Sequence, residues 1–276
     1  MSLAINRDGV QKTLLVPLWS RAKFSRQGRS ILVDSKAIEL VESLQFDFGP
    51  INRNLPEMIQ LMNVVRARMF DDSIRSYLTA RPKATIVNLG AGLDTTFSRV
   101  DNGTLRWYDI DLPDVVELRR RLIPETDRSH CIAGSIFEMK LPDSIGNGAD
   151  GLLFFSGGVL EYFDPARVGR FLSDLAGAFP GSELVFNTTV KSRIAAFFTN
   201  RSMKRMGMKA DPVKWGIKLI DRLRRHDSRI ELVERYPMFS RIDMETAWSG
   251  KTRRRMRWLD RTKAMNMVHL RFSDRA

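Results

Sequence analysis

The spacing of apolar residues changes near residue 80. Before that point, apolar positions recur every three or four residues, which is the period of a helix with one buried face. The most regular set is Ile59, Met62, Val65 and Met69. Pro56 predicts where this helix opens, because proline is favoured in the first helical turn. Asp34 predicts the N-cap of an earlier helix that extends through Ser43.

Beyond residue 80, short apolar runs alternate with helical segments. Five runs predict strands, at residues 84–89, 106–110, 130–133, 151–155 and 183–188. Helices are predicted at 115–122 and 165–179, the second with Asp164 as its N-cap and Pro165 in its first turn. This alternation predicts an α/β fold with a parallel sheet and helices on both faces. Residues 230–235 and 267–272 predict two further strands.

A glycine turn, Gly90-Ala91-Gly92, follows the first predicted strand. Glycine allows the backbone to approach a ligand closely. The next strand ends in Asp109 and Asp111, and a carboxylate there can bind both hydroxyls of a ribose. Thr95 replaces the third glycine of a dinucleotide fingerprint, and no triphosphate-binding loop motif occurs. A nucleoside without phosphates remains, and S-adenosylmethionine is the common one.

Five segments of the chain carry a family resemblance. They are residues 12–23, 66–72, 87–95, 107–119 and 158–163. Together they resemble the leucine carboxyl methyltransferase superfamily, and most closely its bacterial polyketide-type O-methyltransferase branch. The resemblance implies a Rossmann-like, seven-stranded, mostly parallel sheet with helices on both faces, one of the last two strands reversed, and an N-terminal helical cap.

The resemblance also implies one methyltransferase domain over residues 1–276. Residues 1–80 would form the helical cap or lid, and residues 81–276 the core with a lid insertion near 191–225. Apolar side chains between residues 195 and 215 predict an adaptable cover over the acceptor, with packing beneath a helix as the alternative. They are Phe197, Phe198, Met203, Met206 and Met208.

Ligands of such sheets bind beyond the carboxyl ends of the strands. There the resemblance places Gly90-Ala91-Gly92 against the amino-acid and ribose parts of the cofactor. It marks Asp111 as the ribose ligand, with Asp109 as the alternative. Ser135-Ile136 is expected beside the adenine. Gly157 is expected to line the methionine end, although many relatives have a glutamate there that would bind the cofactor's amino group.

Two arginines precede the first strand, and a guanidinium can bind the cofactor's carboxylate through two hydrogen bonds. One of Arg66 and Arg68 is expected to do so, and Arg66 is the prediction. The alternative for Arg68 is a helical surface pair with Asp71 or Asp72.

No general base is predicted. A carboxylate acceptor is already an anion at neutral pH and needs positioning more than proton removal, whereas a hydroxyl acceptor needs a proton acceptor within hydrogen-bond reach. Tyr162 and Glu161 follow the fourth predicted strand and could face the acceptor, with Tyr162 as the catalytic candidate. The alternative has Tyr162 packed under the sheet with Glu161 in solvent. The shortage of well-placed histidines favours a carboxylate. The sequence thus predicts an S-adenosylmethionine-dependent O-methyltransferase acting on a small organic acceptor.

Composition is that of a folded protein, with 276 residues, 43% hydrophobic and 28% charged. No apolar run is long enough to span a bilayer and the N-terminus does not resemble a signal peptide, so a cytoplasmic protein without a membrane partner is predicted. Cys131 is the only cysteine, which excludes an internal disulfide and a cysteine-based zinc cluster, and no metal is expected.

The net charge of +13 is concentrated after residue 190, most densely in residues 251–261. Such a field attracts anions. A nucleic-acid methyltransferase is therefore one alternative function, although no distinct nucleic-acid module is present. A second alternative is a cofactor-binding protein without catalysis, which the glycine at position 157 suggests.

Overall fold

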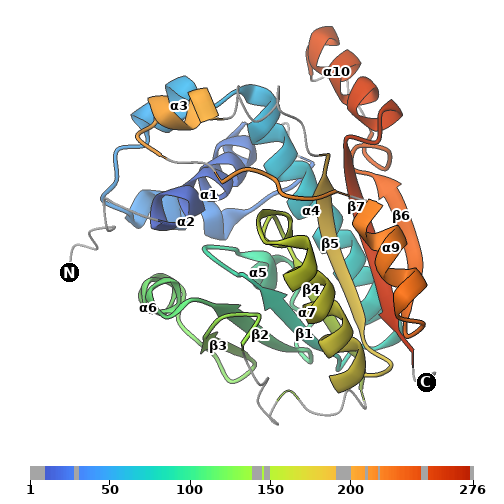
Figure 1. Cartoon of the computed structure of the whole chain (residues 1–276). Helices are drawn as coiled ribbons and strands as arrows, with labels where there is room; N and C mark the ends of the chain where they lie inside the picture. The colour runs from blue at the N-terminus through green and yellow to red at the C-terminus, as the bar shows by residue number, and fades with distance from the viewer. Residues whose placement is uncertain are drawn as a thin grey trace.

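The computed structural model describes residues 10–27, 31–138, 145, 150–190, 200–208, 211–216, 218–243 and 248–273. Its centre is a seven-stranded sheet in the order β3-β2-β1-β4-β5-β7-β6 (Figure 1). Five strands run parallel, namely β1 (Thr85–Leu89), β2 (Arg106–Asp111), β3 (Ser129–Ala133), β4 (Leu152–Ser156) and β5 (Glu183–Thr189). The last strand, β7 (Met265–Phe272), runs antiparallel to both β5 and β6 (Ile230–Pro237). The predicted fold class and all seven predicted strands are confirmed.

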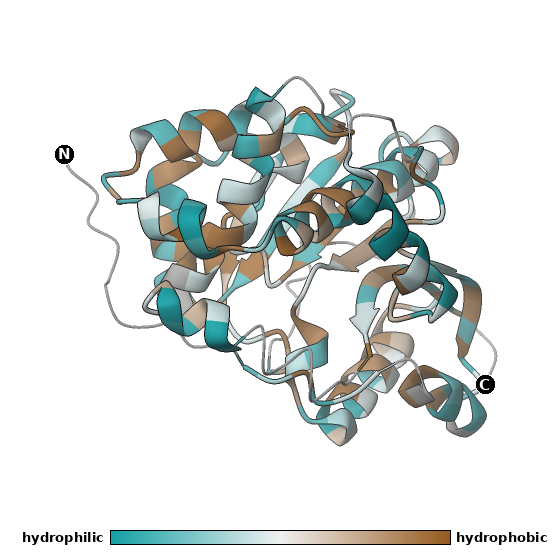
Figure 2. Ribbon diagram, turned by 90° about the horizontal axis from the view of Figure 1, so that it is seen from above, coloured by the Kyte–Doolittle hydropathy of each residue, from teal (hydrophilic) through white to brown (hydrophobic). Residues whose placement is uncertain are grey.

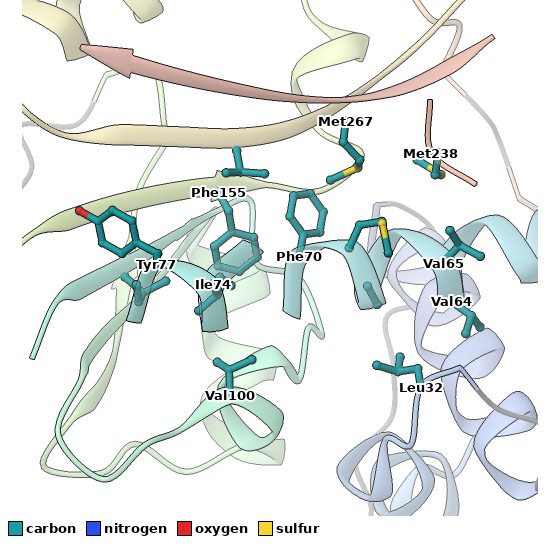
Figure 3. Packing of buried hydrophobic residues seen from close by; sticks show 14 of the residues in the cluster. Leu32, Val64, Val65, Phe70, Ile74, Tyr77, Val100, Phe155, Met238 and Met267 are labelled. Carbon is teal, nitrogen blue, oxygen red and sulfur yellow. The ribbon is translucent and has the colours of Figure 1, made fainter. Parts of the chain in front are cut away.

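Helices cover both faces of the sheet because alternate strand residues point to opposite sides. Phe155 points toward the face covered by α4 (Glu57–Ala80), α5 (Thr96–Val100) and α10 (Gly250–Arg261). Its neighbour Phe154 points to the face covered by α7 (Pro165–Ala178) and α9 (Lys218–His226). Figure 3 shows Phe70 and Ile74 of α4 against Phe155 in the first of these layers. Most helices therefore carry both hydrophobic and hydrophilic segments (Figure 2).

Three helices form a cap beside the sheet, α1 (Val10–Arg26), α2 (Ser35–Ser43) and α3 (Gly49–Asn54) (Figure 1). They share a hydrophobic cluster with α6 (Pro113–Leu122). Met206 and Met208 are buried in the same cluster, so these two pack as core; Phe197 and Phe198 lie outside the described residues. The short helix η2 (Leu160–Tyr162) follows β4. None of the helices in the described ranges combines the length and apolar character needed to cross a bilayer.

Asp34 confirms the predicted cap of α2, since its carboxylate accepts a hydrogen bond from the amide of Ala37 at 2.9 Å. The side chain is fully buried and its other oxygen receives three more donors. They are Arg21 Nε at 2.8 Å, Arg99 Nη1 at 2.6 Å and Thr95 Oγ1 at 2.6 Å. Arg21 and Arg99 therefore share the carboxylate of Asp34 in the interior.

The two arginines extend this network to other elements. Arg99 also donates to both oxygens of Asp71 on α4, at 2.8 and 2.9 Å. Arg21 donates to the carbonyl of Leu93, 3.0 Å away, in the segment after the glycine turn. The cap helices are thus bound to α4, to α5 and to the loop that follows β1.

A second charged cluster lies across β5 and β7. Glu183 is nearly fully buried, with His269 Nε2 at 2.6 Å and Arg271 at 3.1 Å from its carboxylate oxygens. Burial alone would raise the pKa of Glu183, but hydrogen bonds and charge from His269 and Arg271 outweigh it and hold this pKa below its ordinary value of 4.5. A carboxylate that is harder to protonate in the folded state stabilises the fold above the unfolded pKa and loses that contribution as pH falls.

We therefore expect acid to remove the stability that the ionised Glu183 contributes to the wild type. The Glu183→Gln variant lacks this contribution at every pH. Urea unfolding at pH values from 5 down to 3 should give a stability advantage of the wild type over Glu183→Gln that is present at about pH 5 and shrinks as the pH falls below 4.5. Comparing the two proteins cancels the titration of the other carboxylates. A difference that stays constant down to pH 3, or grows, would contradict this assignment.

Candidate cofactor site

The turn after β1 requires its two glycines. Gly90 and Gly92 have φ angles of +76° and +50°, in the left-handed region that favours glycine. A Cβ on Gly90 would lie 2.6 Å from Val159, and one on Gly92 would lie 3.0 Å from Leu14 of α1. The amides of Gly90 and Ala91 both donate to the carbonyl at the end of β2, at 2.8 and 3.0 Å. The predicted turn is therefore present, fixed to β2 and closely approached by its neighbours.

Asp109 and Asp111 have different surroundings, although the sequence could not separate them. Asp109 is buried, accepts from Asn88 Nδ2 at 2.9 Å, and pairs with Arg119 Nη2 at 2.5 Å. Asp111 is partly exposed and accepts from the amide of Gly92 at 2.7 Å. Burial raises the pKa of Asp111, and this amide bond opposes the rise. Asp109 is thus occupied inside the protein, whereas Asp111 remains accessible beside the glycine turn.

The predicted adenine contacts, Ser135 and Ile136, lie directly after β3. Ser135 Oγ accepts from the amide of Phe137 at 3.3 Å, which stabilises a turn, and Ile136 is partly buried. Phe137 meets Phe163 edge to face, with ring centroids 4.6 Å apart. No periodic pattern in the sequence indicated this aromatic contact.

The two candidate arginines on α4 separate clearly. Arg68 donates to both oxygens of Asp72 at 2.8 Å, which is the surface pair considered as its alternative. Arg66 instead lies over the segment after β4, where a Cβ on Gly158 would be 2.5 Å from its Nη1. Burial lowers the pKa of Arg66, and the negative charge of Glu161 opposes that shift. Arg66 therefore faces the predicted site and Arg68 does not.

Gly157 lies under an aromatic ring of α4. A Cβ at this position would be 3.0 Å from Cε2 of Phe70, closer than ordinary van der Waals contact. Phe70 is itself packed against Phe155, with ring centroids 5.3 Å apart (Figure 3). A side chain at position 157 would have to displace this ring.

Glu161 is buried rather than in solvent, so the alternative that placed it in solvent is wrong. The residue belongs to η2, and its exposed fraction is 3%. Trp215 Nε1 donates to the carbonyl of Leu160 at 2.8 Å, and the amide of Lys214 donates to the carbonyl of Glu161 at 2.9 Å. Residues 211–216 therefore lie against η2, which hydropathy around Glu161 could not indicate.

The two oxygens of Glu161 are not equally satisfied. Oε1 lies 3.5 Å from Asn187 Nδ2, while the buried Oε2 has no hydrogen-bond partner. Burial raises the pKa of Glu161, and Thr189 and Arg66 offset this only in part. A buried acceptor without a donor is costly, so this oxygen is a candidate ligand contact.

Burial and the charge of Glu161 raise the pKa of Tyr162 to about 12. Its hydroxyl is therefore protonated at neutral pH. Tyr162 can donate a hydrogen bond, but it is poorly suited to accept a proton from an alcohol or phenol.

Comparison with known proteins agrees with this geometry. Residues 16–135 match the model of the family described as leucine carboxyl methyltransferase. The chain is also 35% identical over 191 residues to the tetracenomycin polyketide synthesis O-methyltransferase TcmP of Streptomyces glaucescens, covering 69% of this chain and 70% of that protein. The chain belongs to the leucine carboxyl methyltransferase family. This family member is an S-adenosylmethionine-dependent methyltransferase, as the sequence predicted.

Two further comparisons are consistent with the family. A Gibberella zeae S-adenosyl-L-methionine-dependent methyltransferase, dpfgK, is 29% identical over 130 residues, or 44% of this chain and 43% of that protein. A putative methyltransferase from Thermobifida fusca superposes with a TM-score of 0.57 at 14% identity, covering 92% of this chain and 94% of that one. At this low identity, the second likeness shows the fold alone.

Proposed function

We propose that this methyltransferase transfers the methyl group of S-adenosylmethionine to an oxygen of a small organic acceptor, with a carboxylate as the preferred group. The observation that carries the carboxylate assignment is the protonated state of Tyr162, the catalytic candidate in η2. A hydroxyl acceptor needs a base, and a phenol with a pKa of about 12 does not provide one at neutral pH. The TcmP relative, named as a polyketide O-methyltransferase, supports oxygen and a small molecule.

The residues at the carboxyl edge fit this cofactor. The accessible carboxylate of Asp111 is suited to the ribose hydroxyls, and the glycine turn beside it exposes backbone that a ligand can approach closely. Arg66 is suited to the carboxylate of the methionine end, next to Gly157. Ser135-Ile136 would lie along the adenine. When bound, S-adenosylmethionine supplies a methyl group on a positively charged sulfur.

The protein's own contribution to this reaction is positioning. In the transfer, an acceptor oxygen forms a bond to the methyl carbon while the carbon–sulfur bond breaks and its electron pair stays on sulfur. A carboxylate loses no proton in this step, so orientation and exclusion of water suffice. Tyr162, with its hydroxyl proton retained, can donate a hydrogen bond that orients an acceptor carboxylate. The net charge of +13 attracts such anions.

Incubation of host extract with isotopically labelled S-adenosylmethionine tests this function. We expect one labelled methyl group in a small-molecule fraction, and we expect mild alkali to release it, because methyl esters hydrolyse whereas phenol ethers and N-methyl groups survive. The measurement is mass spectrometry before and after alkali. Label that resists alkali would contradict the carboxylate acceptor. Cofactor binding without any transfer would instead favour a non-catalytic protein.

A second candidate is methylation of a nucleic acid. It is favoured by α10, which contains the arginine-rich segment 251–261, and by Trp258 in this helix, whose exposed fraction is 59%. Arginines beside an exposed aromatic ring can bind phosphates and stack on a base. Label recovered in an RNA or DNA fraction of the same experiment would favour this candidate over a small molecule.

A further inference from the structure

Two opposite charges near the end of β4 lack ion-pair partners among the described residues. Arg66 is half-buried, and its printed hydrogen bond goes to Asn63 Oδ1 at 3.3 Å. Glu161 is 3% exposed, and its Oε2 receives no donor. The charge of each group opposes the pKa shift that burial causes in the other, and no salt bridge joins them. Each therefore retains capacity for a ligand of opposite charge.

The backbone at Gly158 and the side chain of Asn187 link these two charged residues. The guanidinium of Arg66 lies against Gly158, where a Cβ would be 2.5 Å from Nη1. The amide of Gly158 donates to Asn187 Oδ1 at 2.7 Å, and Asn187 Nδ2 lies 3.5 Å from Glu161 Oε1. Gly158 has a φ angle of +71°, so this conformation is specific to glycine. Gly158 thus contacts the guanidinium of Arg66 and is linked through Asn187 to the carboxylate of Glu161.

A buried carboxylate with an unsatisfied oxygen is stabilised by a charged donor. The methionine end of S-adenosylmethionine has both complementary charges, a carboxylate and an α-ammonium group with three donors. We propose that Glu161 binds this α-ammonium group while Arg66 binds the carboxylate. The inference rests on the cofactor assignment made above and adds Glu161, to which the sequence analysis gave no contact with the cofactor.

The surroundings of Gly157 explain why the negative charge comes from position 161. The ring of Phe70 occupies the space that a side chain at position 157 would need. The helix η2 instead carries the buried carboxylate of Glu161, and Trp215 donates a hydrogen bond to the carbonyl of Leu160 in this helix. A glutamate four positions later along the chain therefore compensates for the glycine.

Calorimetric binding of three ligands to the wild type and to Glu161→Gln tests the proposal. S-adenosylhomocysteine has the complete amino-acid end, its analogue 5′-S-(3-carboxypropyl)-5′-thioadenosine lacks only the amino group, and methylthioadenosine lacks the amino-acid end. We expect the wild type to prefer the first over the second by roughly tenfold to a hundredfold, as one charge-assisted hydrogen bond would give. Glu161→Gln should lose that preference and bind methylthioadenosine as the wild type does.

The outcomes separate this inference from the cofactor assignment. A wild type that binds all three ligands equally, or a Glu161→Gln protein that keeps the preference, overturns the role of Glu161 and leaves the cofactor site intact. A wild type that binds none of the ligands overturns both. Glu161→Asp, which keeps the charge, should keep part of the preference even if Glu161→Gln does not fold. Glu117→Gln on the exposed face of α6 is the matched control and should bind all three ligands as the wild type does.

Discussion

Replacing Asp34 by alanine is expected to lower the free energy of unfolding by about 3–5 kcal/mol, the usual cost of removing one partner of a buried ion pair. The substitution leaves the guanidinium groups of Arg21 and Arg99 in the interior without their shared carboxylate. It also removes the hydrogen bond to Ala37 that caps α2. Burial opposes the charge on Arg99, but its bonds to Asp71 and the nearby carboxylates raise its pKa, so this group stays charged.

Urea unfolding at neutral pH measures this loss. The matched control is Glu42→Ala, which breaks the exposed ion pair with Arg26 at 2.7 Å and should cost less than about 1 kcal/mol. Equal losses for the two variants would show that the buried network contributes no more than a surface pair. Thr95 and Leu93 belong to the same network and lie in the segment after the glycine turn. The Asp34→Ala protein should therefore melt at a lower temperature than the wild type when both are saturated with cofactor.

Asp111→Ala is expected to weaken binding of S-adenosylmethionine by roughly tenfold to a hundredfold for each ribose hydrogen bond lost, or about 1.5–3 kcal/mol per bond. The physical reason is that a carboxylate accepts such bonds with its full charge. Isothermal titration calorimetry gives the dissociation constant. A parallel melting experiment should show a smaller stabilisation by the cofactor than in the wild type, since stabilisation follows the affinity for the folded state.

Asp109→Asn is the comparison that decides between the two carboxylates. It leaves the buried Arg119 without its charged partner and should lower thermal stability while largely sparing affinity for the cofactor. If Asp109→Asn weakens binding and Asp111→Ala does not, the ribose ligand is Asp109.

The strands could be predicted because a buried parallel strand needs a continuous apolar run, which is visible in the sequence itself. The runs that contain Ile86 and Phe154 are two examples. The cap at Asp34 was predictable for the same reason, since capping depends on residues a few positions apart. The partners of Asp34 were not predictable, because Arg99 and Thr95 are 65 and 61 residues away and meet it only after the layers pack.

The candidate site shows the same division. The glycine turn and the acidic end of β2 are local signals, and the structure contains both. The choice between Asp109 and Asp111 required the position of Arg119 on α6. The sequence placed Glu161 beside the acceptor or in solvent and gave it no cofactor contact, because a charged residue in a three-residue helix has no periodicity and its contacts with the segments around Trp215 and Asn187 are distant in sequence.

The contact between α1 and the glycine turn limits how this chain can be recombined with its relatives. Leu14 meets the position above Gly92, and Arg21 binds the carbonyl of Leu93, so the first helix and the turn after β1 form one interlocking surface. A chimera that joined the first helix of one parent to the β1 turn of another would mismatch that surface even if every strand were retained. Residues 10–43 and 85–111 should therefore be inherited together from a single parent.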